Sequence, residues 1–151
     1  GESIPAEAVA RSAAALSPDD ILDILFTSGT TGAPKGVVTC HGQNIRTFET
    51  WSATVGLRSD DNYLIINPFF HSFGYKAGWL AAIIRGARML PVKSFDLDAV
   101  LEQIPREQVS MIPGPPTIYQ SLLAHPRRAE FDLSSLRAGV PGRADAARAG
   151  F

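Results

Sequence analysis

The sequence lacks the features that would place the chain in a membrane, in an oxidising compartment or on nucleic acid. No apolar run approaches the ~18 residues that a membrane span needs, and no basic start followed by an apolar run marks a signal peptide. Cys40 is the only cysteine, which excludes a disulfide within the chain and disfavours a structural zinc site. The net charge is −1 and no basic block occurs. We therefore expect a cytoplasmic protein, without a metal site of its own, whose partner is a small molecule.

Methionine is also scarce. The chain begins with Gly1, and Met89 and Met111 are the only methionines, so we expect that the chain was processed or cut from something larger. What is present is ordinary for a globular protein: 45% of the 151 residues are hydrophobic and 19% are charged. The apolar content is sufficient for a hydrophobic core, and no internal repeat occurs.

The most informative stretch reads Leu-Phe-Thr-Ser-Gly-Thr-Thr-Gly-Ala-Pro-Lys-Gly over residues 25–36. Five of the six residues over 21–26 are apolar, which predicts a buried strand, and strand-type residues resume over 37–40. Glycines allow successive backbone N–H groups to converge on one anion, the hydroxyls add neutral donors, and the lysine adds a mobile positive charge. We predict a phosphate-binding loop that uses Thr27, Ser28, Gly29, Thr30, Thr31, Gly32, Lys35 and Gly36.

Two other interpretations of this stretch are weaker. Glycine, serine and threonine often form a flexible turn with no ligand, but the length of the string through Pro34, Lys35 and Gly36 argues against that reading. A Walker A loop needs glycine directly before the lysine and serine or threonine directly after it. This chain has Pro34 and Gly36 at those positions, so the P-loop NTPase interpretation fails at both.

Strand and helix patterns alternate along the rest of the chain. Apolar spacing predicts helices over 6–16, 41–55, 73–86 and 96–106, and strands over 63–67, 87–92 and 109–112. From residue 63 the order is β-α-β-α-β, which predicts an α/β fold with an incomplete sheet flanked by helices. From residue 138 alanine, glycine, arginine and aspartate dominate, so we expect a poorly structured tail.

A second candidate site follows the strand predicted over 63–67. Residues 68–74 read Pro-Phe-Phe-His-Ser-Phe-Gly, and three aromatic rings with one imidazole suit an apolar substrate slot with a polar gate. A single histidine beside aromatics is more often packing than catalysis, and close helix packing alone would explain the two glycines that follow. The candidate substrate-binding residues are Phe70, His71, Phe73, Gly74 and Gly78, and His71 is the candidate catalytic gate.

The string Thr-Ser-Gly-Thr-Thr-Gly-Ala-Pro-Lys-Gly over 27–36 resembles the ATP phosphate-binding signature of the adenylate-forming superfamily, which includes acyl-CoA synthetases, peptide-synthetase adenylation domains and luciferases. The resemblance implies that a carboxylate attacks the α-phosphate of Mg-ATP, which yields an acyl-adenylate and pyrophosphate. A thiol such as coenzyme A then takes the acyl group. The implied cofactors are ATP and Mg²⁺, with coenzyme A as co-substrate. By the same resemblance, His71 lies near the reacting carboxylate and helps to open or close the acyl pocket.

The resemblance covers residues 20–137, which we expect to form part of the large N-terminal, AMP-binding domain of such an enzyme. A lead-in segment over 1–19 and a divergent, poorly ordered tail over 138–151 flank it. The motifs over 67–71, 73–78 and 113–120 are most similar to those of actinobacterial acid–CoA ligases of steroid catabolism, which activate the propanoate side chain of a degraded sterol. We therefore expect a fragment of an ATP-dependent ligase for a fatty acid or a steroid-derived propanoate.

The family's later motifs are absent. The sequence contains no Tyr-Gly-x-Thr-Glu for adenine and magnesium, no Thr-Gly-Asp for the ribose, and no small C-terminal domain with the catalytic lysine, which Lys35 is not. Preorganised electrostatics usually supplies the largest catalytic term, so we expect the fragment to be inactive alone. The alternative is a non-catalytic remnant with a phosphate-binding or interaction role. An incomplete sheet also leaves an unpaired edge through which the chain could self-associate.

Overall fold

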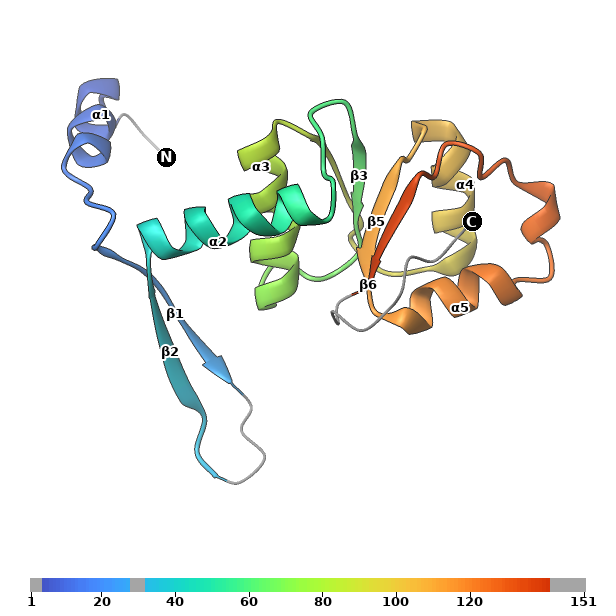
Figure 1. The fold of residues 1–151 in the computed structure, drawn as a ribbon, viewed down its shortest axis with the longest axis horizontal. Helices are drawn as coiled ribbons and strands as arrows, with labels where there is room; N and C mark the ends of the chain where they lie inside the picture. The colour runs from blue at the N-terminus through green and yellow to red at the C-terminus, as the bar shows by residue number, and fades with distance from the viewer. Residues whose placement is uncertain (1–3, 28–31, 142–151) are drawn as a thin grey trace. The chain divides into compact units, whose positions relative to one another are not determined.

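The computed structural model describes residues 4–27 and 32–141. The chain forms two compact units, one over residues 1–47 and the other over residues 48–151. Figure 1 shows the elements of each unit in chain order. None of the helices in the described ranges combines the length and the apolar character that a bilayer span requires.

Unit 1 contains a short helix and a β-hairpin. Helix α1 (Ala6–Ala14) follows the extended Pro5, as the sequence predicts, and none of its residues is buried. Strands β1 (Ile21–Thr27) and β2 (Lys35–Cys40) pair antiparallel, with Ile24 opposite Val38 and Phe26 opposite Gly36. Helix α2 (His41–Thr54) begins directly after β2, so the predicted helix over 41–55 is confirmed.

The prediction that residues 21–26 form a buried strand is wrong in its burial. The strand exists, but Ile24 is 52% exposed and Phe26 is 72% exposed. Cys40, at the end of β2, is half-buried. The physical reason is that this pair of strands forms its own two-stranded sheet, whereas burial of a strand needs a second layer packed on its face. The loop between β1 and β2 joins two antiparallel strands, so it does not lie at the carboxyl edge of a parallel sheet.

Unit 2 is built on a parallel sheet of four strands in the order β4-β3-β5-β6. The strands are β3 (Asn62–Ile65), β4 (Arg88–Pro91), β5 (Met111–Gly114) and β6 (Ala138–Pro141). The helices between them are the π-helix η1 (Phe73–Leu80), α3 (Ala81–Arg85), α4 (Leu97–Glu107), α5 (Pro116–Ala124) and the short 3₁₀ helix η2 (Arg128–Glu130). The predicted β-α-β-α-β order and the α/β fold class are confirmed.

The core of unit 2 lies on both faces of the sheet, and alternate strand residues serve the two faces. Leu64 and Ile112 belong to a cluster with residues of α4 and α5, whereas Tyr63, Ile65 and Met111 belong to a cluster with residues of α3. Figure 1 shows α3 on one side of the sheet and α4 and α5 on the other. This two-sided cover explains why the central strands β3 and β5 are buried along almost their whole length.

The first four residues of the predicted tail are structured. Residues 138–141 form β6, which pairs with β5 along its length, and Val140 is buried at 8% exposure. Gly139 leaves room for the Tyr119 ring of α5, because a Cβ there would lie 2.7 Å from Cε1 of that ring. The expectation of a poorly structured segment is therefore wrong for Ala138–Pro141. The rest of the predicted tail, 142–151, lies outside the described residues.

Strands β3, β5 and β6 are tied together at their amino ends by one buried carboxylate. Asp61, 2% exposed, forms an ion pair with Arg137 and accepts hydrogen bonds from Ser110 Oγ at 2.6 Å and from the Arg58 N–H at 2.8 Å. Burial alone would raise the pKa of Asp61, but the hydrogen bonds from Arg137 and Ser110 hold it below the ordinary value. The network fixes the amino edge of the sheet and leaves the carboxyl edge to the loops that carry the second candidate site.

Candidate functional site

The candidate phosphate loop joins the two strands of the unit 1 hairpin. Thr27 ends β1 and Lys35 begins β2, and the two residues face each other in the register. Thr27 Oγ1 donates a hydrogen bond to the Lys35 carbonyl at 3.4 Å. The Lys35 side chain is exposed, so its ammonium is accessible to a polyphosphate. The predicted Ser28, Gly29, Thr30 and Thr31 lie outside the described residues.

The two described glycines of the loop differ in their surroundings. At Gly32 no atom lies within 4 Å of the place where a Cβ would stand, so the position is sterically open. At Gly36 a Cβ would lie 3.0 Å from Cγ2 of Ile24 and 3.5 Å from Cε1 of Phe26. Gly36 therefore allows apolar side chains of β1 to lie across the hairpin, a packing role that adds to its predicted contact with phosphate.

A polar network at the base of the hairpin was missed by sequence reasoning. Thr39 Oγ1 donates to Asp23 Oδ1 at 2.6 Å, and Asn44 Nδ2 donates to Thr39 Oγ1 at 2.8 Å and to the Cys40 carbonyl at 2.9 Å. Asn44 is buried at 3% exposure. The network connects both strands to the first turn of α2. The signal in the sequence was Asp23, the one polar residue in the apolar run over 21–26.

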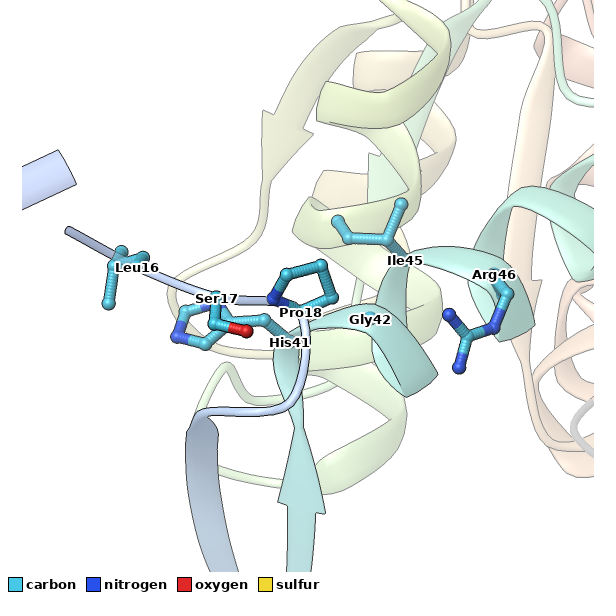
Figure 2. Close-up of a pocket in the computed structure, with 7 residues that line it drawn as sticks. All are labelled: Leu16, Ser17, Pro18, His41, Gly42, Ile45 and Arg46. Atoms are coloured by element: carbon cyan, nitrogen blue, oxygen red, sulfur yellow. The ribbon is translucent and has the colours of Figure 1, made fainter. Parts of the chain in front are cut away.

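Unit 1 also contains a pocket of about 340 Å³ where the segment before β1 meets the first turns of α2. Figure 2 shows Ile45 and Arg46 on α2 and Pro18 on the preceding segment around this pocket. Its lining is mainly apolar, with His41 and Arg46 as the basic groups, and it includes none of the predicted site residues. The pocket is therefore distinct from the loop that joins β1 and β2.

The second candidate site is a tight turn in unit 2 that leads into η1. The His71 N–H donates to the Pro68 carbonyl at 3.0 Å, and the His71 carbonyl accepts from the Tyr75 N–H at 2.9 Å. The Phe73 N–H donates to Nδ1 of His71 at 3.2 Å. His71 is exposed, and Phe70 is 87% exposed. The structure thus places His71 and Phe70 on the surface of the turn.

Phe73, Gly74 and Gly78 lie deeper. The Phe73 ring meets Trp51 edge to face, with 6.4 Å between ring centroids. A Cβ on Gly74 would lie 2.2 Å from the Pro68 carbonyl oxygen, whereas a Cβ on Gly78 would lie 3.0 Å from Cγ2 of Ile65. Both glycines therefore pack η1 against the end of β3. Their predicted contact with substrate remains a prediction.

Sequence reasoning gave no role to Lys76, which the structure buries. Lys76 is 8% exposed, and its Nζ lies 5.8 Å from the centroid of the Tyr75 ring. Tyr75 in turn stacks on Trp79 with 4.7 Å between centroids. The signal was available, because Lys76 is the only charged residue between Phe73 and Arg85. A buried ammonium beside an aromatic ring is stabilised by the negative face of that ring.

Tyr63 reinforces the packing of η1 on the sheet. Its hydroxyl donates to the Ala77 carbonyl at 2.8 Å from a fully buried position on β3. Burial raises the pKa of Tyr63 far above the ordinary value, and the nearby Tyr119 and Asp61 add to the effect. Tyr63 is therefore a neutral donor that holds η1 in place. No group of three or more His, Cys, Asp or Glu side chains within residues 4–27 and 32–141 could hold a metal ion.

The two candidate groups belong to different units. Thr27, Gly32, Lys35 and Gly36 belong to unit 1, whereas Phe70, His71, Phe73, Gly74 and Gly78 belong to unit 2. Within unit 1 the hairpin brings Thr27 and Lys35 together. Within unit 2 the turn brings His71, Phe73 and Gly74 together.

Comparison with known proteins finds ligases among the proteins that this chain resembles. A family model described as "AMP-binding enzyme" matches residues 2–149. The chain is 52% identical over 143 residues to a 3-[(3aS,4S,7aS)-7a-methyl-1,5-dioxo-octahydro-1H-inden-4-yl]propanoyl:CoA ligase of Rhodococcus jostii, a match that covers 95% of this chain and 28% of that protein. It is 55% identical over 138 residues to the ligase of the same name from Mycobacterium tuberculosis, covering 91% of this chain and 27% of that protein. The chain thus spans less than a third of the length of these relatives.

Solved structures give the same picture. The N-terminal domain of FACL13 from Mycobacterium tuberculosis, solved with an inhibitor bound, aligns with a TM-score of 0.73 and 32% identity, covering 80% of this chain and 30% of that chain. The o-succinylbenzoate coenzyme A synthetase MenE from Bacillus subtilis, solved in complex with AMP, aligns with a TM-score of 0.73 and 30% identity, covering 85% of this chain and 32% of that chain. The parallel sheet with helices on both faces is therefore the fold of these N-terminal domains.

Proposed function

The chain belongs to the AMP-binding enzyme family, and we propose that it carries the phosphate-binding loop and part of the acid-binding surface of an ATP-dependent acid–CoA ligase. The observation that carries the proposal is the 52% identity to a propanoyl-CoA ligase over 95% of this chain. In the proposed reaction a carboxylate becomes an acyl-adenylate and then a coenzyme A thioester. The substrate class is a propanoate side chain on a fused-ring, steroid-derived acid, or a fatty acid.

The described residues suit ATP at the hairpin. The exposed ammonium of Lys35 and the hydroxyl of Thr27 stand at the two ends of the loop, where they can neutralise and bind phosphate oxygens. ATP supplies the adenylyl group that activates the acid, and pyrophosphate is the leaving group. Mg²⁺ is part of the proposal through the family resemblance, but no residue is assigned as its ligand, because the described part of the chain has no acidic cluster that fits it.

The acid would meet the turn of unit 2. Phe70 offers an exposed aromatic ring, His71 an exposed imidazole, and Phe73 a half-buried ring, which together suit a carboxylate on an apolar body. We propose that His71 is the gate beside the reacting carboxylate. Gly74 and Gly78 shape the wall of the turn by letting η1 approach β3.

We also propose that the chain alone has no ligase turnover, because it lacks the family's later motifs for adenine, ribose and metal. The alternative is a non-catalytic remnant with a phosphate-binding or interaction role only. We further propose a cytoplasmic location and self-association through the sheet edge. Continuous release of pyrophosphate from the purified chain with ATP and acid would contradict the proposed inactivity.

A chimera separates the ligase from the remnant. This chain would replace the matching segment of the Rhodococcus jostii relative, and acyl-CoA formation from that relative's propanoate substrate would be measured. A ligase segment should support turnover, and Lys35→Ala in the chimera should lower kcat/KM by roughly a hundredfold, since a positioned charge on a phosphoryl group is a large term. Lys93→Ala, an exposed lysine of unit 2, is the matched control and should have no effect. A folded but inactive chimera would favour the remnant.

A further inference from the structure

We infer that Gly74 is a positioning residue for His71: it lets the turn over residues 67–74 close, so that the Phe73 N–H holds Nδ1 and the ring meets substrate as a neutral donor through Nε2. The inference rests on the proposed acid-binding role of His71 and adds how that ring is oriented and which of its nitrogens carries the proton.

The first step is the closure of the turn. A Cβ on residue 74 would lie 2.2 Å from the Pro68 carbonyl oxygen, 2.5 Å from the Asn67 carbonyl oxygen and 2.7 Å from the Pro68 carbonyl carbon. These are backbone atoms, which cannot swing aside as a flexible side chain can. Glycine at position 74 is therefore required for the backbone of η1 to pass this close to the end of β3.

The second step is the hold on the ring. The Pro68 carbonyl that crowds Gly74 also accepts the His71 N–H at 3.0 Å, so the same close approach fixes the His71 backbone. Two residues further on, the Phe73 N–H donates to Nδ1 at 3.2 Å. In a neutral imidazole one nitrogen accepts and the other carries the proton. Because Nδ1 accepts, the proton lies on Nε2.

The third step is what Nε2 can do. His71 is exposed, and among the described residues none forms a hydrogen bond or ion pair with its Nε2. A protonated Nε2 is a donor, and a carboxylate oxygen is an acceptor only, so the pair is complementary. A ring held in this form orients the acid and cannot take a proton through Nε2. His71 thus acts by hydrogen bonding and not as a general base.

His125 provides an internal reference with the same local bond. The Arg127 N–H donates to Nδ1 of His125 at 3.2 Å, which matches the bond at His71 in length and in residue spacing. Its Nε2, however, lies 3.3 Å from Asp98 Oδ1, and its side chain is only 10% exposed. Both ring nitrogens of His125 therefore have partners. Its NMR signals serve as the reference, because a substitution at residue 74 should not change them.

The experiment is ¹⁵N NMR of the histidine rings and hydrogen exchange of the Phe73 amide in the whole, ligand-free chain. The variants are Gly74→Ala and, as the matched control on the same helix, Gly78→Ala. The Cβ added at residue 78 would lie 3.0 Å from Cγ2 of the Ile65 side chain and at an ordinary contact distance of 3.7 Å from the nearest backbone atom, the Phe73 carbonyl oxygen. Wild type and Gly78→Ala should show His71 with its proton on Nε2. Gly74→Ala should lose this single form, and its Phe73 amide should exchange roughly fivefold to tenfold faster. The His125 signals should stay unchanged in all three.

Two outcomes would overturn the inference: a wild-type His71 with its proton on Nδ1, or a folded Gly74→Ala variant with wild-type His71 and Phe73 signals. If Gly74→Ala loses the His125 signals, that variant has unfolded, and the test is then a comparison of His71→Asn with His71→Ala. Asparagine can place Oδ1 near the position of Nδ1 and should keep the Phe73 amide protected, whereas alanine should not. Equal protection in both would overturn the inference. None of these experiments uses ATP or acid, so a result that overturns this inference is distinct from a result that overturns the proposed function.

Discussion

Isoleucines on the two sheets of this protein lie in opposite surroundings. Ile24 of β1 is 52% exposed on a two-stranded hairpin, whereas Ile65 of β3 is 1% exposed in a sheet with helices on both faces. Both strands are rich in apolar residues. Apolar content therefore favours a strand in each case, but the number of packed layers decides whether the strand is buried.

The largest effect should come from a matched pair of substitutions on these two strands. Ile65→Ala should lower the free energy of unfolding by about 4 kcal/mol, because it removes a fully buried side chain and leaves a cavity. Ile24→Ala should change it by less than about 0.5 kcal/mol, since that side chain is already half in water. Urea unfolding followed by circular dichroism measures both. Equal losses would show that the hairpin face is covered in solution.

The next largest effect concerns the buried ion pair at the amino edge of the unit 2 sheet. Asp61→Asn should cost about 3 kcal/mol, because it breaks a buried ion pair whose partner Arg137 is 32% exposed and can be partly rehydrated. Asp60→Asn, at the neighbouring exposed carboxylate, is the control and should cost little. The same urea titration measures both, and a cost below about 1 kcal/mol for Asp61→Asn would contradict the role of this network.

Acid should weaken unit 2 through the same carboxylate. The pKa of Asp61 is lower in the folded chain than its ordinary value of 3.8, so its stabilisation is complete above that value. The stabilisation is lost as the pH falls through the lower, folded pKa. Unfolding free energy measured from pH 6 to pH 2 should fall in wild type and fall less steeply in Asp61→Asn. Parallel curves for the two proteins would contradict this assignment.

The smallest effect concerns the sheet edge. Among the described strands, β4 lies at one edge of the unit 2 sheet, and its Met89 is 40% exposed. If the chain self-associates through this edge, Met89→Lys should raise the dissociation constant about tenfold, since an edge lysine opposes strand addition. Ile83→Lys, at an exposed position on α3, should not. Sedimentation over a concentration series measures both, and a wild type that stays monomeric would contradict the self-association proposal.

The sequence was sufficient for the order of elements and insufficient for burial and edges. Periodicity predicts β-α-β-α-β because it reports local face alternation, and the π-helix, α3 and α4 follow the expected helices. Periodicity does not report which layers of secondary structure pack on one another, so the predicted burial of residues 21–26 was wrong. The residues of β6 were assigned to the poorly structured tail, because the stability of this strand comes from pairing with β5, which is more than twenty residues away.

The candidate site divides in the same way. Thr27 and Lys35 could be located from the motif, and the structure places them at the two ends of the hairpin loop. Gly74 was predicted as a substrate-binding residue. Its close approach to the Pro68 carbonyl could not be predicted, because it depends on how η1 folds back on β3. The buried Lys76 was missed for a similar reason, because only tertiary packing tells whether a charged helix residue faces water.

The central claim is that the loop between β1 and β2 binds phosphate, and calorimetric titration of the purified chain with Mg-ATP and, separately, with pyrophosphate tests it most directly. The wild type and Lys93→Ala should bind both ligands, and Lys35→Ala should lose most of the affinity because it removes the one lysine of the loop. Binding that survives Lys35→Ala, or a folded wild type that binds neither ligand, would contradict the account.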